Sequence, residues 1–70
     1  MERLTRLIYR ELLPHLRIES VQPTNPVVVR TTPAPWRMLG AGNYAAVFYH
    51  PDFPEHVVKV YAPDRPGIEA

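Results

Sequence analysis

The chain has 70 residues, of which 46% are hydrophobic and 21% are charged, with a formal net charge of +1 and no cysteine. This length allows one small domain of marginal stability, and the composition is typical of a globular chain. The small net charge argues against nucleic acid or a membrane as partner, and no apolar run reaches the length of a signal peptide or a membrane span. The cytoplasm is therefore the expected location.

Disulfides are excluded, and a metal site is not expected. The three histidines, His15, His50 and His56, lack the spacing of metal ligands and have no thiol partners. We expect all three at the surface or in turns.

Residues 1–20 are expected to form an N-terminal helical region. Residues 2–13 place Leu4, Leu7, Ile8 and Leu12 at helical spacing, and Pro14 is expected to end or kink the helix. A helix this short is marginal alone, so its leucine stripe is expected to pack on the rest of the domain. Its arginines are expected to be solvated.

Residues 21–35 are predicted to be a connector. Four prolines lie between positions 20 and 35 and exclude a long helix. The run at 27–30, Val-Val-Val-Arg, is expected to form one edge strand within the connector.

Residues 36–70 are predicted to form a small antiparallel sheet, with strands at about 36–40, 44–49 and 56–61. Turns are expected at 50–55 and 62–67, and Ile68 could open a further helix. With the N-terminal amphipathic helix, this predicts an α+β fold.

The turn between the first two of these strands contains Gly40 and Gly42. Glycines allow positive φ and let bare backbone amides approach an anion. Pro51 follows too soon for a helix after the glycines, which argues against Rossmann and Walker loops. An ordinary glycine hairpin is the alternative.

Lys59, in the third predicted strand, is the only lysine beside seven arginines. A lysine at this one place favours a site that needs a compact ammonium charge rather than a planar guanidinium.

These residues resemble the start of the protein kinase domain of the eukaryotic-type Ser/Thr kinase-like family, as found in bacterial proteins. Its signatures are G-x-G-x-x-G-x-V and a strand lysine. Gly40 and Gly42 match the first two glycines, Tyr44 the aromatic residue at the loop tip, Val47 the following valine and Lys59 the lysine. The resemblance covers residues 36–70.

Two positions depart from the family pattern. Ala45 stands where a third glycine is usual, which puts the flexibility of the loop in doubt. Val57 stands where a small alanine is usual and would narrow the nucleotide pocket.

The resemblance implies that this sheet is the nucleotide-covering half of an ATP site, with Mg²⁺ accompanying the ATP. Leu39 and Val47 would face the adenine, and Lys59 would pair with the α- and β-phosphates as the one catalytic residue. The backbone that would cover the phosphates is that of Gly40, Ala41, Gly42, Asn43, Tyr44 and Ala45.

The sequence contains neither H-R-D nor D-F-G, so the chain is expected to end before the catalytic lobe and to be inactive alone. Phosphoryl transfer to a protein substrate would belong to a full-length parent. The alternatives are a pseudokinase-type scaffold without catalysis and a small β-sheet module that binds a protein partner. An incomplete core also predicts self-association of the isolated chain.

Overall fold

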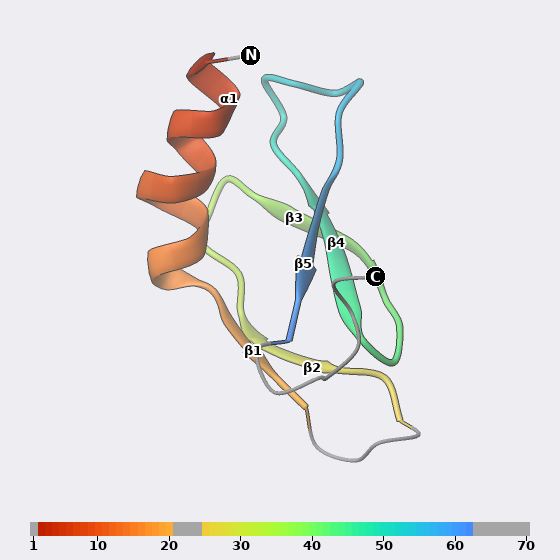
Figure 1. Ribbon diagram of the computed structural model, residues 1–70. Coiled ribbons are helices and arrows are strands. Elements are labelled where there is room, and N and C mark those ends of the chain that lie inside the picture. The colour runs from red at the N-terminus through yellow and green to blue at the C-terminus, as the bar shows by residue number, and fades with distance from the viewer. Residues whose placement is uncertain (1, 21–24, 63–70) are drawn as a thin grey trace.

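The computed structural model describes residues 2–20 and 25–62. One helical segment packs beside two small antiparallel sheets, which confirms the α+β class (Figure 1). The elements in chain order are α1 (Glu2–Leu7), a π-helical segment η1 (Ile8–Leu12), a 3-10 segment η2 (Leu13–His15), β1 (Arg17–Glu19), β2 (Val28–Thr31), β3 (Arg37–Ala41), β4 (Ala45–Tyr49) and β5 (Val58–Tyr61).

The three-stranded sheet has the order β3-β4-β5, with both pairs antiparallel. Each strand begins and ends within two residues of the predicted bounds. Strand β4 lies in the middle, and its side chains alternate between two faces. Ala46 and Phe48 are fully buried on the inner face, so Val47 lies on the outer face.

The helical segment ends at His15, and Pro14, which was expected to end or kink the helix, lies within its final 3-10 turn. Leu4 and Leu12 are eight positions apart, which in a regular α-helix leaves them ~80° apart around the axis. The wider turn of the π-helical segment reduces this offset. Both leucines are buried, so the leucine stripe packs on the chain's own core as expected.

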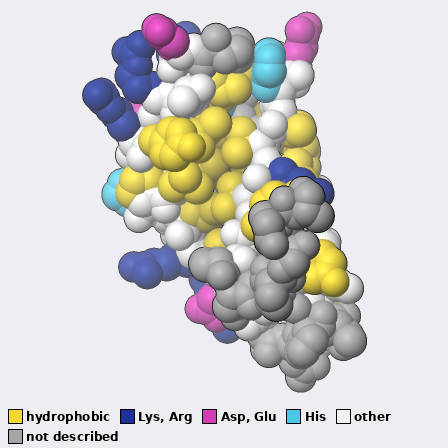
Figure 2. All heavy atoms as spheres, in the orientation of Figure 1, with side chains coloured by type: hydrophobic (Ala, Val, Ile, Leu, Met, Phe, Trp, Pro, Cys, Tyr) yellow, Lys and Arg dark blue, Asp and Glu magenta, His cyan; other side chains and the backbone are white. Residues whose placement is uncertain are grey.

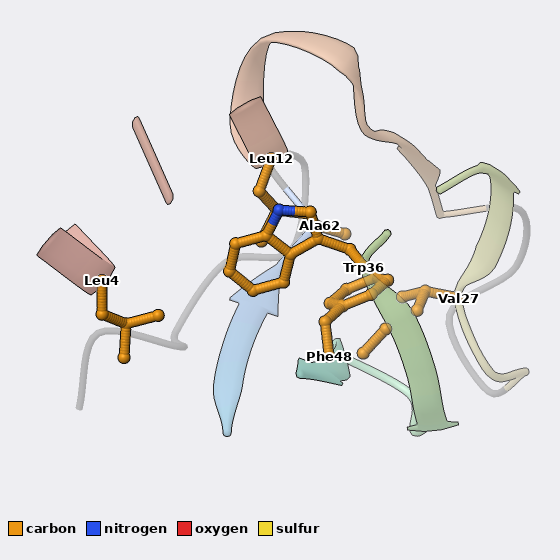
Figure 3. Close-up of a cluster of buried hydrophobic side chains, with 7 residues drawn as sticks. Leu4, Leu12, Val27, Trp36, Phe48 and Ala62 are labelled. Carbon is orange, nitrogen blue, oxygen red and sulfur yellow. The ribbon is translucent and has the colours of Figure 1, made fainter. Parts of the chain in front are cut away.

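The core lies between the helical segment and the inner face of the three-stranded sheet. Figure 3 shows the Trp36 indole at the centre of the cluster, with Leu12 and Phe48 on either side. Leu4, Val27 and Ala62 are the other labelled members, and Val27 and Ala62 join the beginning and the end of residues 25–62 to the same core. The indole Nε1–H of Trp36 is buried without a hydrogen-bond partner among the described residues. An unmade hydrogen bond of this kind costs about 1–3 kcal/mol.

A second sheet pairs β1 with β2 antiparallel. The run at 27–30 was predicted to be an edge strand, and the observed strand is Val28–Thr31. Its partner, Arg17–Glu19, was not predicted, because residues 1–20 were assigned to the helical region alone. The turn predicted at 62–67, apart from Ala62, and the helix start at Ile68 lie outside the described residues.

The turn after β4 is ordered around a histidine. His50 lies at the start of this turn, which agrees with the expected turn position, but it is only 6% exposed and so does not lie at the surface. Its ring lies edge-on to Trp36 and Phe53, with centroids 5.1 and 5.9 Å away, and its Nδ1 accepts the Asp52 N–H at 3.1 Å. His15 and His56 are exposed, as expected.

The arginines of the helix lie on its solvent side. Arg3 pairs with Asp52 at 3.2 Å and lies over the Phe53 ring, and Arg6 approaches Glu2 at 3.9 Å. Exposed pairs of this kind each contribute at most about 1 kcal/mol. No helix in the described ranges is both long enough and apolar enough to cross a membrane.

Large hydrophobic side chains remain exposed around the three-stranded sheet. Figure 2 shows hydrophobic side chains across the middle of one face of the molecule, with Lys and Arg side chains toward its edges. Over the sheet and its hairpin, the exposed large hydrophobics are Met38, Leu39, Tyr44, Val57 and Tyr61. A surface of this kind favours contact between molecules.

We expect Leu12→Ala to lower the free energy of unfolding by about 2–5 kcal/mol, because Leu12 is completely buried. The neighbouring Leu13 is 39% exposed, so Leu13→Ala serves as the matched control and should cost less than about 1 kcal/mol. Urea denaturation followed by circular dichroism measures both values. Equal losses in the two variants would contradict this description of the core.

We expect the isolated chain to self-associate through the outer face of the three-stranded sheet. Val57 is 61% exposed there, so Val57→Asp should shift a dimer or larger assembly toward monomer. Tyr9→Asp, at a helix residue that is 67% exposed, is the control and should leave the assembly unchanged. Light scattering measures the mass, and a monomeric wild-type chain at high concentration would refute the expectation.

Candidate functional site

The glycine hairpin connects β3 to β4 and is held by two backbone hydrogen bonds. The Gly42 N–H donates to the Ala45 carbonyl oxygen at 2.8 Å, which closes the turn. The Gly42 carbonyl oxygen accepts the Val27 N–H at 2.8 Å, which ties the tip to the chain before β2. The Gly42 amide is therefore not a free donor for an anion. Asn43 and Tyr44 are exposed at the tip, and neither backbone N–H donates to another described residue.

The two glycines do not have the conformation that the sequence suggested. Neither Gly40 nor Gly42 has φ in the left-handed region, so positive φ is not the reason for glycine here. A Cβ added to Gly40 would meet no atom within 4 Å, and one added to Gly42 would meet only the Ala45 carbonyl oxygen, at 3.9 Å. The packing of the described chain therefore does not require glycine at position 40.

An irregularity in β3 decides which of its residues lies opposite Val47 in the central strand β4. Met38 pairs with Phe48, whereas Gly40 pairs with Val47, so Leu39 is an extra residue without a partner in β4. Without this bulge, Leu39 would occupy the position opposite Val47. The bulge places Gly40 there instead, and Leu39 remains 58% exposed.

One row of residues crosses all three strands on the outer face. Gly40 pairs with Val47, and Val47 pairs with Lys59. Adjacent strands are about 4.8 Å apart, so the backbones of Gly40 and Lys59 are roughly 10 Å apart. An extended lysine side chain and a bound polyphosphate can bridge that distance.

The next outer position on the same strands pairs Ala45 with Tyr61. Tyr61 follows Lys59 by two residues and so shares its face, and the Lys59 Nζ lies 5.3 Å from the centroid of the Tyr61 ring. Val57, two residues before Lys59, is also exposed. Sequence reasoning did not single out Tyr61, although its spacing from Lys59 placed it on the same face.

The predicted site residues thus divide into three groups. Gly40, Val47 and Lys59 form the row, and Ala45 lies beside it on the outer face. Ala41 pairs instead with the buried Ala46, and Ala41 itself is exposed at the end of β3. The residues that remain apart from the row are Leu39, at the bulge, and Gly42, Asn43 and Tyr44, at the tip.

The charge near this face is positive and unpaired within the described chain. The ion pairs among the described residues join Arg3 to Asp52, Arg6 to Glu2 and Arg30 to Glu19. None of these pairs includes Lys59. Residues 2–20 and 25–62 contain no group of three His, Cys, Asp or Glu that could hold a metal ion. The outer face can therefore offer an ammonium group and open space, which suit an anion.

Comparisons of the chain with protein families, with curated proteins and with solved structures gave no match.

We expect Gly40→Val to leave the stability of the fold nearly unchanged, because its side chain would enter open space on the outer face. Ala46→Val is the matched control, since Ala46 is fully buried in the same hairpin and overpacking costs about 1–3 kcal/mol. Thermal unfolding measured by circular dichroism compares the two. A larger loss for Gly40→Val than for Ala46→Val would show that the space in front of Gly40 is filled.

Proposed function

We propose that the outer face of the β3-β4-β5 sheet binds the phosphate groups of ATP, as a nucleotide-binding part of a Ser/Thr protein kinase-like protein. The observation that carries this proposal is the row Gly40–Val47–Lys59, with open space where a Cβ of Gly40 would lie. A glycine that its own chain does not need is explained by close approach of a ligand.

The chemistry of the row suits a phosphate. The Lys59 ammonium is exposed and has no carboxylate partner among the described residues, so its charge is available to an anion. The bare backbone at Gly40 lets an anion approach the sheet closely, and Val47 between them offers an apolar contact to the rest of the ligand. The amides of Asn43 and Tyr44 supply further donors at the tip.

In this proposal the chain binds nucleotide and does not itself transfer phosphate. Phosphoryl transfer depends on a positioned base and on metal ions that bridge the phosphates. Mg²⁺ would arrive bound to the ATP phosphates. A phosphoacceptor protein and the catalytic groups would belong to a full-length parent, and the cytoplasm, where ATP and protein substrates meet, is the proposed location.

A second candidate function is a module that binds a protein partner through the same sheet. The observation in its favour is the exposure of Val57, Tyr44 and Leu39, which are 61%, 55% and 58% accessible. The occupied Gly42 amide also leaves fewer donors for a phosphate than a free glycine loop would offer. In this alternative Lys59 contacts an acidic group of the partner.

We expect the chain to bind Mg²⁺–ATP more tightly than adenosine, and Lys59→Met to weaken ATP binding at least about 10-fold. The reason is the loss of a charge-assisted contact to phosphate. Amide chemical shifts in an NMR titration measure affinity and locate the site. Arg30→Met, which removes an exposed cation from β2 in the other sheet, is the matched control and should change ATP affinity little.

Three results would count against ATP binding at this face. They are no binding by the wild-type chain, equal affinity for ATP and adenosine, or wild-type affinity in the Lys59→Met variant. The first of these would favour the protein-binding module.

A further inference from the structure

We infer that Tyr61 is a positioning residue for Lys59, which it holds against the sheet through a cation–π contact so that the ammonium stays available to an anion. This inference rests on the proposed binding of phosphate at the outer face. It assigns a role to a residue that the kinase-like motif does not include.

The geometry places the two side chains in contact. Lys59 and Tyr61 are two residues apart on β5 and therefore point to the same face. The Lys59 Nζ lies 5.3 Å from the Tyr61 ring centroid, within the range of a cation–π interaction. The cross-strand neighbour of Tyr61 is Ala45, whose small methyl group leaves the ring room beside the row.

A tyrosine ring has a different effect on lysine than a carboxylate has. A carboxylate neutralises the ammonium and occupies its donors, whereas the ring contacts the cation through its π face and leaves the charge in place. None of the ion pairs in the described chain involves Lys59. The Tyr61 ring is thus the contact that restrains this cation while its N–H donors remain open.

The restraint favours binding because a free lysine side chain has many rotamers. Ordering such a side chain opposes association, and a contact that already orders it reduces that cost. Lys59 lies in the row with Gly40 and Val47, so a lysine held toward Tyr61 stays over the outer face beside the glycine hairpin.

The test uses the fact that Lys59 is the only lysine in the chain. Labelling with ¹³C-lysine therefore gives a single set of side-chain NMR signals. In the wild-type chain, the ε-CH₂ protons should be shifted upfield by the ring current of Tyr61. Tyr61→Phe keeps the ring and should keep this shift, and Tyr61→Leu should return the signals to free-lysine values. Tyr44→Leu, at the exposed tip, is the control and should leave them unchanged.

The second measurement is affinity for inorganic pyrophosphate and for Mg²⁺–ATP. Tyr61→Leu should weaken both about two- to fivefold, and Tyr61→Phe should restore wild-type affinity. An unshifted Lys59 signal in the wild-type chain overturns the inference, whatever the affinity. Wild-type affinity in Tyr61→Leu overturns it as well, while leaving the proposed function intact. A shifted Lys59 signal with no anion binding by the wild-type chain overturns the proposed function and the positioning role that rests on it.

Discussion

The two-sided character of β4 is the constraint on which the rest of the structure depends. This strand has a neighbour on each side. Ala46 and Phe48 lie in the core, whereas Ala45 and Val47 lie on the opposite face, where Ala45 is itself only 5% exposed. The side-chain period of a strand is two, so the register that buries Phe48 also fixes the face of every paired residue. A one-residue slip of β5 would turn Lys59 inward and expose Val58 and Val60. The cost of burying an unpaired ammonium opposes that slip.

The core that enforces this register is small and draws on distant parts of the chain. Leu12 from the helical segment, Trp36 before β3 and Ala62 after β5 meet around Phe48. The buried Nε1–H of Trp36 has no hydrogen-bond partner among the described residues. The largest side chain of the cluster therefore stabilises the core by its burial but loses part of that free energy to an unmade hydrogen bond. A domain of this size has a small free energy of unfolding. The structure of the outer face therefore depends on the helical segment that packs against the inner face of the sheet.

The local pattern of the sequence predicted the elements better than their pairing. The β-forming run Val47-Phe48-Tyr49, the Val-rich run near Lys59 and the turn residues between them predict the three antiparallel strands. The strand Arg17–Glu19 escaped prediction because three residues after a proline-interrupted helix carry almost no periodic signal. Its partner β2 lies within the proline-rich connector, and the pairing of the two strands depends on packing that a short sequence window does not contain.

The candidate site was predictable in its residue types and not in its arrangement. The glycines and the lone lysine stand out in the sequence, but the bulge at Leu39, which sets Gly40 opposite Val47, depends on how the two strands pair. The burial of His50 also escaped prediction, because it results from the contacts of its ring with Trp36 and Phe53. The prediction that the glycines adopt positive φ is wrong. This turn closes through the hydrogen bond from the Gly42 N–H to the Ala45 carbonyl oxygen, and neither glycine has positive φ.

The hydrogen bond from the Val27 N–H to the Gly42 carbonyl oxygen links the tip of the hairpin to a distant part of the chain. Glycine turns are usually regarded as local hinges, whose motion depends on their own few residues. Here the tip is anchored to a segment whose side chain, that of Val27, is itself buried in the core. Any motion that lifts the hairpin from the sheet must either break this bond or pull on the core. The mobility of the glycine hairpin is thus governed in part by the proline-rich connector, and changes in that connector act on the hairpin from outside its own sequence.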